Sequence, residues 1–165
     1  MTKEQFPELA KALQLHRYWL ERPYDIPGHT VAFGMLNPSM ATHEDNDPTI
    51  TRCEGFAKRD KAGRMIVVNM FSLVSPEPDD LLRAESVRGP LHEDYIRKAI
   101  READVFILAF GAPKKRIRVK SWLTRRLLQQ EGRGFHCLGR SKDGWPKHPL
   151  YLKGDTKIEE WSFPE

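Results

Sequence analysis

The segment TVAFGMLNPSMATHEDNDPTITRCEGFA, residues 30–57, joins a buried strand to a helix and decides the fold class. Residues 30–36 are almost continuously apolar, which is typical of a strand covered on both faces. Asp47 and Pro48 then supply an N-cap and a first helical residue, so a helix is predicted over residues 48–60. The connection between them carries amide, hydroxyl, imidazole and carboxylate groups. A turn alone needs far fewer polar groups.

The alternation of strand and helix continues along the chain. Further strands are predicted over residues 64–70 and 104–110, with 135–138 as a candidate fourth strand, and further helices over residues 90–103 and 116–130. Residues 16–36 read as a strand, a turn built on Pro23, Asp25, Pro27 and Gly28, and the strand over residues 30–36. Residues 79–83 are a candidate helical turn. We therefore expect a single α/β domain over residues 1–165. Its predicted architecture is a three-layer sandwich, with a mostly parallel central sheet and helices on both faces.

Charge is distributed unevenly along the chain. The net charge is +4, but residues 113–142 contain ten Lys or Arg against one acid, which leaves −5 for the rest. Such a basic block predicts a polyanionic partner, nucleic acid or nucleotide. The alternative is a solvated helix face whose charges meet acids from elsewhere in the fold.

Composition also limits location and cofactors. Cys53 and Cys137 are the two cysteines, and neither lies at zinc-ligand spacing with other Cys or His residues. No stretch approaches the roughly 20 apolar residues that cross a bilayer. The polar N-terminus does not read as a signal peptide. We expect a cytoplasmic protein without a metal, a cofactor or a membrane partner; the sequence does not indicate an oligomeric state.

Candidate site residues gather where the predicted strands end, because ligands of parallel sheets bind beyond the carboxyl ends of the strands. Asn37 can hold a water or read a base edge, or it can tie the loop to a neighbouring strand. Asp45 can activate water or remain an exposed loop acid, whereas Asp47 reads mainly as an N-cap. His148 lies in a turn-rich segment and is a candidate ligand contact. The candidate ligand-binding residues are Ser39, Thr49, Arg52, Asn69, Gly111, Lys114 and Lys115.

Several of these residues also have structural interpretations. Asn69 would cost about 1–3 kcal/mol if it were buried and unpaired, so structural support is an alternative to ligand binding. Arg52 can reach an anion or form a surface ion pair, and Gly111 can admit a ligand or simply form a turn. Trp145 can stack on a base or cover the edge of the core. His43 and His136 are weaker candidates.

Five motifs occur in an order that resembles a known family. They are MLNPSMA, DPTITRCEGFA, VVNMF, AFGA and HCLGRSKDGWPKHPLYL. Together they resemble the family called domain of unknown function 1643, whose members occur in bacteria and bacteriophages. The resemblance extends from about Arg17 to Trp161 and implies no activity.

A second resemblance is to the uracil-DNA glycosylase superfamily. Residues 34–39 (GMLNPS) are similar to its G-I-N-P-G motif, residues 108–115 to a motif ending in two lysines, and His148-Pro149 to part of its H-P-S-P motif. The resemblance implies that Asn37 positions an attacking water and that His148 contacts the base. Leu150 and Tyr151 depart from the serine and proline of that motif.

Three functions follow from these patterns. The first is an N-glycosidic-bond hydrolase or transferase acting on a nucleotide or nucleic acid, with Asn37 and Asp45 orienting water and His148 stabilising the departing base. The second is a non-catalytic nucleotide- or nucleic-acid-binding accessory protein of a phage or bacterium. The third is metal-dependent phosphoryl transfer, with Glu44, Asp45 and Asp47 as the metal ligands. It is the weakest of the three, because acids crowded into one loop cannot easily all face one ion.

Overall fold

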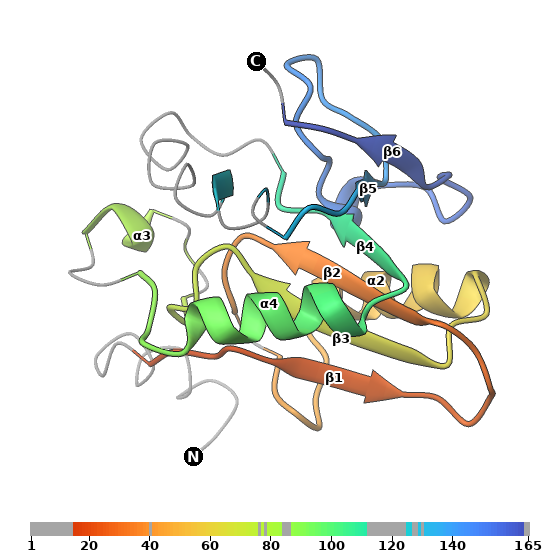
Figure 1. The fold of residues 1–165 in the computed structure, drawn as a ribbon, viewed down its shortest axis with the longest axis horizontal. Helices are drawn as coiled ribbons and strands as arrows, with labels where there is room; N and C mark the ends of the chain where they lie inside the picture. The colour runs from red at the N-terminus through yellow and green to blue at the C-terminus, as the bar shows by residue number, and fades with distance from the viewer. Residues whose placement is uncertain are drawn as a thin grey trace.

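The computed structural model describes residues 15–39, 41–75, 77, 79–83, 87–111, 125–126, 129 and 131–163. Its strands are β1 (Leu20–Pro23), β2 (Thr30–Met35), β3 (Arg64–Asn69), β4 (Val105–Leu108), β5 (Phe135–Cys137) and β6 (Glu159–Trp161). Its helices are α2 (Pro48–Arg59), α3 (Asp80–Arg83), α4 (His92–Glu102) and the one-turn 3-10 helix η1 (Pro149–Tyr151). Figure 1 shows their arrangement.

The strands form one six-stranded mixed sheet in the order β1-β3-β2-β4-β5-β6. The four inner strands are parallel, with Phe33 of β2 opposite Val67 of β3 and Ile107 of β4. β1 and β6 run antiparallel at the two edges. The predicted α/β class with a mostly parallel sheet is therefore confirmed. The edge strand β6 was not predicted.

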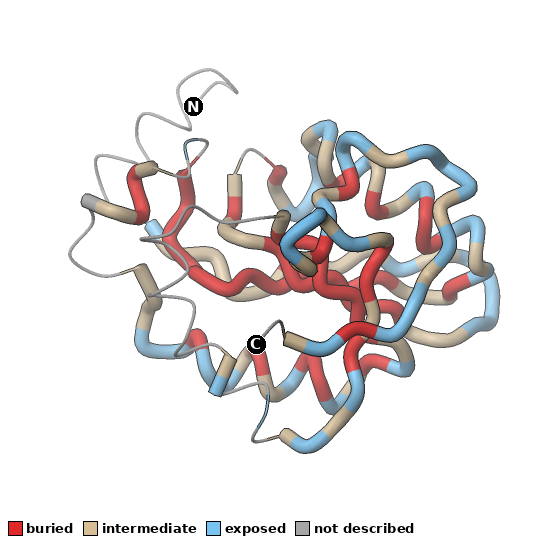
Figure 2. Tube along the Cα trace, turned by 90° about the horizontal axis from the view of Figure 1, so that it is seen from above, coloured by how far each residue is buried: buried red, intermediate tan, exposed pale blue. Residues whose placement is uncertain are grey.

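In the described part of the chain, α2 packs on one face of the sheet and α4 on the other, because the side chains of the strands alternate between two cores (Figure 1). Phe33 and Val67 face α2, where they meet Ile50, Cys53 and Phe56. The alternate residues face α4 and its apolar stripe. Viewed from above, the strands form a buried band through the centre of the molecule (Figure 2). This two-sided burial explains the almost continuously apolar strand sequences.

Most predicted elements agree with the structure to within a few residues. Helix 48–60 and strands 30–36 and 64–70 match α2, β2 and β3 closely, whereas strand 104–110 is shorter, at Val105–Leu108. The predicted helix 116–130 lies outside the described residues except at 125, 126 and 129. Within the described part of the chain, no helix is long and apolar enough to cross a bilayer.

The connections define where a ligand would bind. From β2 the chain passes through α2 to β3 on one side, and from β3 it passes through α4 to β4 on the other side of β2. Sheets of this type bind ligands where the direction of winding reverses, beyond the carboxyl ends of the two strands. The loops after β2 and β4 flank that position, which we call the β2–β4 rim.

Candidate functional site

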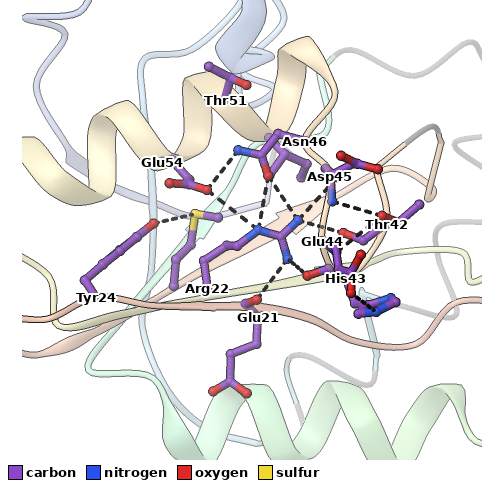
Figure 3. A network of polar contacts seen from close by, with 12 residues as sticks. Glu21, Arg22, Tyr24, Thr42, His43, Glu44, Asp45, Asn46, Thr51 and Glu54 are labelled. Atoms are coloured by element: carbon purple, nitrogen blue, oxygen red, sulfur yellow. Dashed lines mark hydrogen bonds and ion pairs between the residues drawn. The ribbon is translucent and has the colours of Figure 1, made fainter. Parts of the chain in front are cut away.

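The polar loop after β2 is built around a guanidinium group from β1 (Figure 3). Arg22 donates hydrogen bonds to the carbonyl oxygens of Thr42 at 2.6 Å and His43 at 3.0 Å, and to Oδ1 of Asn46 at 3.0 Å. Its Nε lies 3.7 Å from the Glu54 carboxylate of α2, and its side chain is only 12% exposed. Many of the polar groups of the loop thus bind the guanidinium of Arg22, which is mostly shielded from solvent. These contacts fix the loop in front of α2.

A second arginine binds the other end of the same loop. Arg17 Nη1 donates to the carbonyl oxygen of Ala41, while the Ala41 N–H lies 3.3 Å from Oδ2 of Asp47. Burial lowers the pKa of Arg17 to about 10, and the opposite charge of Asp47 counteracts that effect. Arg17 was not predicted from the sequence, because no local pattern indicates that a residue before β1 contacts a loop after β2.

Asn37 connects the loops that follow β2 and β3. Its Nδ2 group donates to the carbonyl oxygens of Pro38 at 3.1 Å, Leu73 at 3.4 Å and Ser75 at 2.8 Å. These bonds correspond to the loop-tying alternative for Asn37. Oδ1, an acceptor, is the atom of this amide that remains able to hold a water.

Two carboxylates of the loop differ in their surroundings. Asp45 is exposed; its N–H donates to Thr42 Oγ1 at 2.9 Å, and its carbonyl oxygen lies 3.4 Å from Arg22 Nη2. Asp47 is half-buried and caps α2, because its Oδ1 accepts the N–H of Ile50 at 2.8 Å. Asp47 is also the carboxylate whose charge acts on His148. The predicted N-cap is confirmed, and Asp47 additionally belongs to the rim.

His148 lies beside the exit of β4. A Cβ added to Gly111 would be 3.6 Å from Cβ of His148, and Gly111 has a positive φ of 76° that favours glycine. Nδ1 of His148 accepts the N–H of Leu150 at 3.2 Å, so the neutral ring carries its proton on Nε2. Burial lowers the pKa of His148, and the charge of Asp47 opposes this shift. His148 is therefore a neutral hydrogen-bond donor near a carboxylate.

Arg52 of α2 positions the segment that carries His148. Its guanidinium donates to the carbonyl oxygens of Leu152 and, at 3.5 Å, Pro149. One turn further along α2, Arg59 donates to the carbonyl oxygens of Gly154 at 2.9 Å and Thr156 at 2.5 Å. Arg52 therefore holds backbone, rather than presenting its whole guanidinium to a ligand. This role involves contacts about one hundred residues apart, which sequence spacing does not reveal.

The remaining candidates lie near the strand ends or outside the described residues. Ser39 is half-buried near the start of the loop after β2, and Thr49 is half-buried in the first turn of α2. Asn69 is only 5% exposed, and its carbonyl oxygen accepts a hydrogen bond from Nε2 of His92 at 2.8 Å. Lys114 and Lys115 lie outside the described residues.

The rim therefore offers a small set of chemical groups. Asp47 supplies a carboxylate, His148 an N–H donor and Asn37 an acceptor oxygen, and Gly111 lies beside His148. Among the described residues, no three His, Cys, Asp or Glu side chains form a group that could hold a metal ion. The group composition fits acid–base and hydrogen-bonding chemistry.

Comparison with known families assigns the chain on its sequence. The profile of a family described as "Protein of unknown function (DUF1643)" matches residues 17–150. The chain belongs to the DUF1643 family. All the rim residues named above, from Arg17 to His148, lie within the part of the chain that matches DUF1643.

The other two comparisons add nothing to that assignment. No curated protein and no solved structure matches the chain. Membership of DUF1643 is thus shown, whereas the resemblance to uracil-DNA glycosylases receives no support from these comparisons and stays a prediction.

Proposed function

We propose that this protein binds a nucleotide unit, free or within a nucleic acid, at the β2–β4 rim and hydrolyses its N-glycosidic bond. The observation that carries the proposal is the neutral His148 ring, whose proton is on Nε2 because Nδ1 accepts the Leu150 N–H, and on which the charge of Asp47 acts, at the point where the winding of the sheet reverses. A three-layer, glycosylase-like architecture is part of the same proposal.

The reaction places complementary demands on the two residues. Cleavage of an N-glycosidic bond leaves negative charge on the departing base. A neutral imidazole can stabilise that charge by donating a hydrogen bond from its N–H group. Attack by water needs a carboxylate to accept a proton or to stabilise the positive charge that develops on the sugar. We assign these roles to His148 and Asp47.

From the sequence alone, the carboxylate role was predicted for Asp45. In the structure, Asp45 is an exposed residue of the loop that Arg22 binds. The charge that acts on His148 is that of Asp47. We therefore favour Asp47 as the catalytic carboxylate. Asn37 keeps its predicted role through Oδ1, because its Nδ2 already donates to backbone carbonyl oxygens.

A binding protein without catalysis is the second candidate. It is favoured by the hydrogen bonds of Asp47, since one carboxylate oxygen caps α2 and the other lies 3.3 Å from the Ala41 N–H. With both oxygens in such contacts, the Asp47 carboxylate supports the loop whether or not the protein is a catalyst. Thermal-shift measurements with nucleoside monophosphates test binding, because a ligand of the folded state raises the unfolding midpoint. Chromatography for free base after incubation tests hydrolysis separately.

A further inference from the structure

Tyr151 is the most exposed large apolar side chain in the described part of the chain. It is 85% exposed, whereas the next, Ile26, is 48% exposed. Full exposure of a tyrosine leaves its ring in water and contributes nothing to the core. A residue of this kind next to a candidate site is a possible contact for a partner.

The backbone beneath Tyr151 is fixed from two sides. Nδ1 of His148 caps the short helix η1 by accepting the Leu150 N–H, and Arg52 of α2 donates to the carbonyl oxygens on either side of Tyr151, those of Pro149 and Leu152. The rings of Tyr151 and His148 are 6.1 Å apart and tilted by 48°. The exposed ring is thus presented by a constrained turn and lies directly beyond the rim histidine.

The charge around this turn indicates the chemistry of the partner. Residues 140–157 carry five Lys or Arg and two Asp, and Lys147 and Lys153 are exposed on either side of η1 in the sequence. An aromatic ring among exposed cations suits a chain of phosphates that bears planar bases. A protein partner would instead favour a larger apolar patch, and the neighbouring Leu150 is only 37% exposed.

We infer that the ligand of the rim is a single-stranded nucleic acid and that Tyr151 stacks on the base next to the one held at His148. This inference rests on the proposed function and deepens it, because a free nucleotide would occupy the rim without needing Tyr151. Phosphates between the two bases face Lys147 and Lys153. Stacking on an aromatic ring tolerates any base, so affinity depends little on sequence at that position.

The test compares Tyr151→Ala with Tyr151→Phe, which keeps the ring. Anisotropy of a labelled oligothymidylate of about ten nucleotides measures affinity, and thermal shift with thymidine monophosphate measures occupation of the rim. Tyr151→Ala should weaken oligonucleotide affinity about 5- to 150-fold, while Tyr151→Phe stays near wild type. Affinity of the wild type should also fall steeply with salt. Both variants should keep the wild-type unfolding midpoint and bind the mononucleotide equally well.

The remaining outcomes separate this inference from the proposed function. Equal oligonucleotide affinity of Tyr151→Ala and wild type overturns the stacking role. Binding of the mononucleotide without binding of the oligonucleotide also overturns it, and the proposed function stands. If wild-type protein binds neither probe, the inference and the proposed function both fall. Self-association of the wild type that is lost in Tyr151→Ala, without any oligonucleotide binding, identifies a protein partner and contradicts the inference.

Discussion

Asp47 and His148 are linked across about one hundred residues of sequence: burial lowers the pKa of the imidazole beside the exit of β4, and the charge of the carboxylate that caps α2 opposes this shift. Asparagine is as good an N-cap as aspartate but carries no charge. Asp47→Asn should therefore keep the cap of α2 and lower the pKa of His148 further, as NMR titration of its ring would show. Its effect on stability should come only from loss of the negative charge that counteracts the burial of Arg17. Asp47→Ala should cost about 1 kcal/mol through loss of the cap. An unchanged His148 pKa in both variants would contradict the interaction.

Arg22 should be the main support of the loop after β2. Arg22→Ala removes its hydrogen bonds to Thr42, His43 and Asn46, and we expect a loss of about 2–3 kcal/mol in urea unfolding. Arg101, whose side chain is 69% exposed, is the matched control, and Arg101→Ala should change stability by no more than about 0.5 kcal/mol. Similar effects of the two substitutions would show that the loop does not depend on Arg22.

Burial of His92 should make stability depend on pH. Burial lowers the pKa of His92 from 6.5 to about 4, and its hydrogen bond to the Asn69 carbonyl oxygen opposes this only in part. The unfolded chain therefore takes up the proton first, and stability should fall as the pH drops from 6.5 towards 4, by up to about 3 kcal/mol.

Substitution can show whether His92 causes this dependence of stability on pH. His92→Gln should flatten the pH dependence between 6.5 and 4, whereas His43→Gln should not, because the His43 side chain is 88% exposed. Denaturant unfolding at several pH values measures both. An unaltered slope in His92→Gln would assign the acid sensitivity to other groups.

Two glycines should respond to alanine in opposite directions. A Cβ at Gly34 of β2 would lie 2.9 Å from Leu108 Cδ2 and 3.0 Å from Phe106 Cε1, both in the core, so Gly34→Ala should destabilise by about 1–3 kcal/mol. Gly55 of α2 has no neighbour within 4 Å of such a Cβ, and Gly55→Ala should stabilise by up to about 1 kcal/mol. Thermal unfolding distinguishes the two. Stabilisation by Gly34→Ala would contradict the close approach of β2 and β4.

The inner strands and α2 could be predicted from sequence because each leaves a local signal. Residues 30–36 and 64–70 are almost continuously apolar since both faces are covered, and Asp47-Pro48 marks the start of a helix. The antiparallel edge strand β6, with two exposed glutamates in three residues, has too little apolar patterning to be recognised.

The site was harder to predict, because its contacts join distant parts of the chain. The sequence distinguishes Asp47 from Asp45 as an N-cap, but only the fold brings the charge of Asp47 to act on His148. Arg17 and Arg22 bind the loop from positions about twenty residues earlier, and Arg52 holds carbonyl oxygens about one hundred residues later. Partners at such separations leave no pattern of spacing.

Release of free base is the most direct test of the central claim that the β2–β4 rim cleaves an N-glycosidic bond. Labelled nucleotides and single-stranded DNA would be incubated with wild-type protein and with His148→Ala, Asp47→Asn and Asp45→Asn, and free base would be separated by chromatography. We predict release by the wild type and by Asp45→Asn, and a loss of about 10²–10⁴-fold in Asp47→Asn and His148→Ala. Loss of activity in Asp45→Asn alone would return the catalytic role to Asp45. Absence of base release by the wild type from every substrate would contradict the claim.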